Sequence, residues 1–74
     1  MAVNYNKLWK LLIDNNMNKT DLRIKADIGT ATLAKLGKNQ PVSMDVMLKI
    51  CSVFSCNIAD VMDVIPEVNS KWKN

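Results

Sequence analysis

Basic side chains recur through residues 19–38, the part of this sequence best suited to bind an anion. Lysine and arginine donate charge-assisted hydrogen bonds to phosphate and carboxylate oxygens, so their clustering marks a candidate binding surface. The charge is uneven along the chain: residues 1–39 hold seven basic and three acidic side chains, whereas residues 40–67 hold one basic and four acidic. With a net charge of +3, the first half of the chain is the side that an anionic partner is expected to meet.

The residue types that support catalysis or metal binding are scarce. The chain has no histidine, and it shows no glycine-rich phosphate loop and no paired carboxylates, so we expect no enzyme activity, no cofactor and no small-molecule ligand. Cys51 and Cys56 fall in a helical apolar pattern, and the two further soft ligands of a zinc site are absent. We expect both cysteines to be small core residues, with no metal bound and no disulfide between them.

Apolar spacing and helix caps predict one domain over residues 1–66, followed by a polar tail over residues 67–74. The expected fold class is all-α, a compact bundle of five short helices. These helices are expected near residues 4–15, 18–27, 30–36, 43–54 and 57–65. Their inward stripes contain Tyr5, Leu8, Trp9, Leu12, Ile13, Leu22, Ala26, Leu33, Leu36, Met47, Ile50, Cys51, Phe54, Ile58, Val61, Met62 and Ile65.

Two of the expected helices are joined by only three residues, Asp27, Ile28 and Gly29. Asn18 is expected to cap the first of the two, with an aspartate three residues later accepting from its backbone. Packing of this helix against the next leaves the outer face of residues 30–36 bare. That face is short, small and basic, and such a helix fits the major groove of B-DNA, which is about 12 Å wide. The pattern predicts a helix-turn-helix that binds double-stranded DNA.

A wider set of residues fits one known domain pattern. The set consists of residues 18–22, Ile28, Leu33, Leu36, residues 47–51 and residues 58–62. On these residues the chain resembles a Cro/C1-type helix-turn-helix domain of the XRE family, which has the lambda-repressor-like fold. The resemblance implies a small, stand-alone bacterial transcriptional regulator, either a repressor or an activator. Two positions depart from the family pattern: Arg23 replaces a small residue, and Asp27 replaces glycine.

The expected DNA contacts come from the same two helices and the loop that follows them. The resemblance implies that Lys19 touches the DNA backbone and that the third helix reads bases. The base-reading candidates are Thr30, Ala31, Thr32 and Lys35. The DNA-backbone candidates are Asn18, Lys19, Arg23, Lys38 and Asn39. A structural alternative stays open for these residues, because threonines also cap helices and lysines also solvate exposed faces.

A recognition helix of about two turns reaches few base pairs, so we expect a weak homodimer that binds an inverted repeat. The dimer candidates are Val46, Val53, Val68 and Trp72. Three of them (Val46, Val53 and Trp72), together with Ile24, leave a second function open: an antitoxin-like module that holds a partner protein. The sequence shows no signal peptide and no membrane-spanning run, which favours a cytoplasmic protein.

Overall fold

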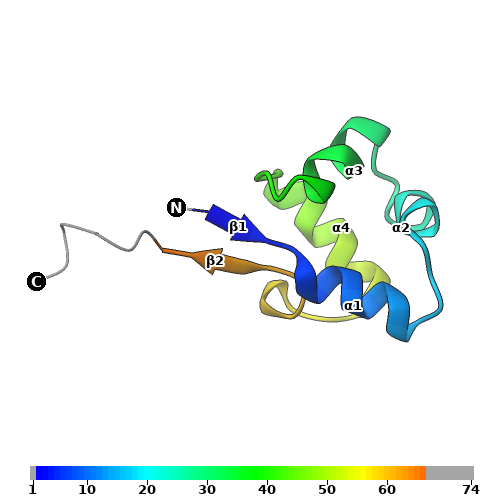
Figure 1. Ribbon diagram of the computed structural model, residues 1–74. Helices are drawn as coiled ribbons and strands as arrows, with labels where there is room; N and C mark the ends of the chain where they lie inside the picture. Colours follow the sequence, from blue (N-terminus) through cyan, green and yellow to red (C-terminus); the bar gives the residue numbers. More distant parts are fainter. Residues whose placement is uncertain (1, 67–74) are drawn as a thin grey trace, which may run out of the picture.

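Four amphipathic segments form α-helices in the computed structural model, which describes residues 2–66 (Figure 1). The helices are α1 (Asn6–Asp14), α2 (Lys19–Ala26), α3 (Thr30–Gly37) and α4 (Met44–Phe54), followed by a single 3-10 turn, η1 (Ile58–Asp60). Two three-residue strands, β1 (Ala2–Asn4) and β2 (Asp63–Ile65), pair into a ribbon that projects from the helices on the side opposite α2 (Figure 1). The helix-turn-helix therefore lies apart from the ribbon.

The predicted caps fix where the helices begin and end. Asn18 and Asp21 form a capping box at the start of α2: the Asp21 N–H donates to Asn18 Oδ1 at 2.8 Å, and the Asn18 N–H donates to Asp21 Oδ2 at 3.1 Å. Ser43 caps α4 by accepting from the Val46 N–H at 3.3 Å. Asp27 ends α2 in the left-handed conformation, with φ 56°. The predicted cap at Asn18 is confirmed, because it depends on residues only three positions apart.

The prediction of a fifth helix is wrong, and the mostly helical fold includes a small two-stranded sheet in its place. The chain makes one turn at η1 and then extends as β2, which pairs antiparallel with β1 in the register Ala2↔Ile65, Val3↔Val64 and Asn4↔Asp63. Asn57 starts the turn as expected, since its N–H donates to Asp60 Oδ2 at 3.0 Å. The segment that forms β2 is short, contains two β-branched residues (Val64 and Ile65) and is followed by Pro66. The N-terminal segment offers it a strand partner.

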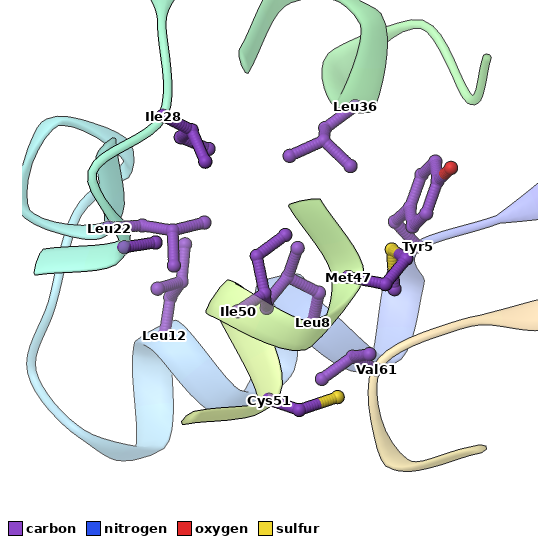
Figure 2. Close-up of a cluster of buried hydrophobic side chains, with 11 residues drawn as sticks. Tyr5, Leu8, Leu12, Leu22, Ile28, Leu36, Met47, Ile50, Cys51 and Val61 are labelled. Carbon is purple, nitrogen blue, oxygen red and sulfur yellow. The ribbon is translucent and has the colours of Figure 1, made fainter. Parts of the chain in front are cut away.

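The core is a single cluster in which side chains from every helix converge on α4 (Figure 2). Its fully buried members come from α1 and its N-cap, from α2, α3 and α4, and from the segment after η1. They are Tyr5, Leu8, Leu22, Leu36, Ile50 and Val61. The predicted inward stripes are confirmed for most positions. Two are wrong: Ile13 is 74% exposed at the end of α1, and Ile65 is 45% exposed on β2.

Both cysteines pack with this core as free thiols. Cys51 is buried in α4 and Cys56 is partly buried just after it. Burial raises the pKa of the Cys56 thiol above its ordinary value, and the neighbouring Cys51 adds to the rise. Both cysteines therefore pack as small residues of the core, and the raised pKa keeps the Cys56 thiol protonated at neutral pH.

Tyr5 ties the start of α1 to the loop between α3 and α4. Its side chain is 1% exposed, and its hydroxyl donates to the Gln40 carbonyl oxygen at 2.8 Å. Its backbone N–H donates to Asn39 Oδ1 at 3.3 Å. Burial raises the pKa of the Tyr5 hydroxyl, and donation to a carbonyl also favours the protonated form. One residue thus holds two distant segments together.

Replacing Tyr5 by phenylalanine tests this link. We expect Tyr5→Phe to lower the free energy of unfolding at pH 7–8 by about 1 kcal/mol, because a hydrogen bond is lost while the ring stays buried. Unfolded tyrosine ionises near pH 10, and the folded-state pKa is raised, so the tyrosine contribution is complete below pH 10 and declines above it. Urea unfolding of both chains at pH 8 and pH 11 should show the difference shrinking. An equal difference at both pH values would contradict the account.

Candidate nucleic-acid interface

A tight, well-supported turn sets the angle between α2 and α3. The turn is made by Asp27, Ile28 and Gly29, and Ile28 points from it into the core (Figure 2). The Ile28 N–H donates to the Arg23 carbonyl oxygen at 3.1 Å, which closes the end of α2. Lys49 of α4 donates to the Asp27 carbonyl oxygen at 3.3 Å. The departure from glycine at position 27 is therefore accommodated, because aspartate tolerates the left-handed conformation.

The third helix buries one edge and exposes the rest. Leu36 is its one fully buried side chain, and Leu33 is partly buried against the same cluster. Thr30, Ala31 and Lys35 are exposed, as is Ala34, whereas Thr32 is partly buried. The structure thus brings three of the four predicted base-reading residues onto one open face. Thr32 stands at its border.

The predicted backbone candidates surround this helix, but several of their polar groups already have partners. Asn18 uses Oδ1 in the capping box of α2, and Asn39 uses Oδ1 to accept from the Tyr5 N–H. Asn39 adopts the left-handed conformation, with φ 56°. Lys38 is exposed at the C-cap of α3, and Arg23 is partly buried on α2. The Oδ1 atoms of both asparagines are therefore already used in hydrogen bonds within the domain.

Lys19 takes a position that sequence spacing did not indicate. Its Nζ lies 4.7 Å from the centroid of the Trp9 ring, the geometry of a cation–π contact. Trp9 itself is partly buried and packs against the core, as its place in the inward stripe predicted. The same Nζ lies 4.0 Å from the place where a Cβ on Gly37 would stand, so it is close to the end of α3. Lys19 thus lies where α1, α2 and α3 meet.

Lys7, a basic residue of the first half of the chain, makes its contacts away from the helix-turn-helix. The Lys7 ammonium lies 3.1 Å from Asp63 Oδ1 and donates to the Ala59 carbonyl oxygen at 3.1 Å. It therefore connects α1 to η1 and β2. Lys7 belongs to the packing of the ribbon and not to the face formed by α2 and α3.

The apolar candidates for a protein interface are only partly available. Val46 and Val53 are partly buried and pack against the core, while Val68 and Trp72 lie outside the described residues. Ile24 is 64% exposed on α2. Other exposed apolar side chains in residues 2–66 are Ile13, Met44, Leu48, Val64 and Ile65.

The described part of the chain offers little for other chemistry. Within residues 2–66, no three His, Cys, Asp or Glu side chains are gathered in a way that could hold a metal ion. The helices found there are too short or too polar to cross a bilayer.

Comparison with known proteins decides the family. A family model described as the Cro/C1-type HTH DNA-binding domain matches residues 7–67. The chain belongs to this Cro/C1-type family. The fold is also similar to the crystal structure of the transcriptional regulator VanUg, with a TM-score of 0.85 and 48% sequence identity over 89% of this chain and 88% of the other. A search of curated proteins gives no match.

Membership of the Cro/C1-type family accounts for the arrangement described above. The family model spans all four helices and both parts of the helix-turn-helix. The resemblance inferred from residues 18–22, 47–51 and 58–62 is confirmed. The chain is therefore a helix-turn-helix DNA-binding domain, similar over most of its length to a known transcriptional regulator.

Proposed function

We propose that this protein is a transcriptional regulator, a repressor or an activator, that recognises a specific double-stranded DNA sequence by inserting α3 into the major groove. The observation that carries the proposal is the open face of α3. Thr30, Ala31 and Lys35 are exposed on this face, while Leu36 on the opposite side of the helix is buried in the core. Small side chains allow the helix axis to approach the base edges, and one lysine supplies a donor for guanine. The N-terminal end of α3 enters the groove first.

The proposed contacts divide into two kinds. Thr30, Ala31 and Lys35 read base edges, with Thr32 at the border of that face. The DNA backbone is contacted by Asn18, Lys19, Arg23, Lys38 and Asn39. The two asparagines, whose Oδ1 atoms serve the fold, have amide N–H groups to offer to phosphates. In this proposal the stem of Arg23, a partly buried residue, lies over the pair of helices and its guanidinium reaches a phosphate.

Salt dependence tests the DNA-binding proposal. If Lys19, Arg23 and Lys38 each neutralise one phosphate, log Kd for a selected duplex should rise with log salt with a slope of about 2.7 per protomer. Fluorescence anisotropy at several salt concentrations measures this slope. A control variant, Lys10→Ala, should keep the same slope as the parent chain. Lys10 lines a hollow with Asp14 and Asp60 and lies outside the proposed DNA contacts.

A flat titration, or no binding at low salt, would contradict the proposal. That result would favour the alternative function, an antitoxin-like module that binds a protein partner. The partial burial of Val46 and Val53 reduces the apolar surface available both to that alternative and to a homodimer.

We further propose that the protein binds DNA as a weak homodimer. An eight-residue α3 is about 12 Å long and reaches only a few base pairs. Pairing across a two-fold axis doubles the recognised sequence. The pairing surface is placed in the second half of the chain, since opposing lysines on the helix-turn-helix would repel. Val46, Val53, Val68 and Trp72 are its candidates.

Sedimentation tests the homodimer directly. Free protein at low concentration should sediment mainly as the monomer, and addition of a selected duplex should give a complex with two protomers per site. Selected sequences should form an inverted repeat with half-sites about one helical turn apart. One protomer on a site without dyad symmetry would show that the protein works as a monomer.

A further inference from the structure

Trp9 lies outside the helix-turn-helix, yet it contacts a residue placed at the DNA-facing end of α2. The Lys19 Nζ stands 4.7 Å from the centroid of the Trp9 ring. Lys19 is exposed, whereas Trp9 is partly buried and packs against the core. The ring is therefore held by the body of the domain, and it presents a π face to a flexible cation.

The Lys19 ammonium lies in an unfavourable electrostatic position, which a contact with an aromatic ring can offset. As the first residue of α2, Lys19 lies at the end of a helix that carries partial positive charge, which disfavours a cation. Its Nζ also lies close to Gly37 at the end of α3, where the helix carries partial negative charge. The Trp9 ring and the end of α3 both attract the ammonium, and together they offset the unfavourable position.

Lys19 is an exposed residue, so a partner in solution can reach it. Apart from Lys19 Nζ, no atom lies within 4 Å of the place where a Cβ on Gly37 would stand, its own helix backbone and two chain neighbours aside. An ammonium on a ring face has further N–H groups directed away from the ring. A phosphate oxygen can therefore accept from Lys19 while the cation–π contact persists.

We propose that Trp9 is a positioning residue that holds the Lys19 ammonium in place to bind a phosphate of the DNA backbone. The inference rests on the proposed DNA-binding function. A free lysine side chain loses much rotamer freedom when it is fixed on a phosphate. The Trp9 contact removes part of that freedom before DNA arrives, so binding costs less conformational entropy. Because a phosphate carries no sequence information, Trp9 raises affinity for all duplexes alike.

A double-mutant cycle tests the proposal. Trp9→Leu should weaken binding of the selected duplex about two- to fivefold, because more of the rotamer freedom of Lys19 is then lost on binding. In the Lys19→Ala background, Trp9→Leu should leave Kd unchanged. Trp9→Phe, which keeps an aromatic face, should recover part of the affinity of the parent. Thermal melting of every variant shows whether it remains folded.

The outcomes separate this inference from the function on which it rests. If the parent chain shows no salt-dependent duplex binding, the proposed function fails. If the parent binds but Trp9→Leu weakens binding equally with and without Lys19, Trp9 acts only on the fold and the inference is overturned. Should Trp9→Leu unfold, Trp9→Phe carries the same cycle. It should then cost about twofold in Kd when Lys19 is present and nothing in the Lys19→Ala background.

Discussion

Burial of Leu36 is the interaction on which the exposed face of α3 depends. It is the one fully buried side chain of an eight-residue helix, and it points toward the core that α4 organises (Figure 2). A helix this short is not stable alone in water, so its packing determines its position. With one edge held by Leu36 and Leu33, the remaining side chains are free to face a partner.

Contacts at both ends of α3 hold the helix in its orientation. Before it, Asp27 turns the chain and its carbonyl accepts from Lys49 of α4. After it, Asn39 and Gln40 accept hydrogen bonds from the backbone and side chain of Tyr5. These bonds connect the helix-turn-helix to α4 and α1, so both ends of α3 are tied to the rest of the domain.

The sequence predicted what depends on nearby residues and missed what depends on distant ones. The cap at Asn18 and the inward positions of Leu22 and Ile50 follow from local spacing, and the structure confirms them. The β1–β2 ribbon requires Ala2 to meet Ile65, which helical periodicity cannot reveal. The Trp9–Lys19 contact joins α1 to α2. The apolar spacing within either helix does not show how the two helices pack, so it could not predict this contact. Ile13 is exposed one residue before α1 ends, on the side of the last turn that faces away from the core, whereas its neighbour Leu12 is buried.

The central claim is that α3 reads bases while α2 contacts phosphates. The most direct test is the affinity of Lys35→Ala and Lys19→Ala for every single-base variant of a selected operator. Lys35→Ala should abolish preference at one base pair, by about 1–3 kcal/mol, because its donor to guanine is lost. Lys19→Ala should weaken all duplexes by the same factor. A uniform loss from both variants would show that α3 does not read bases through Lys35.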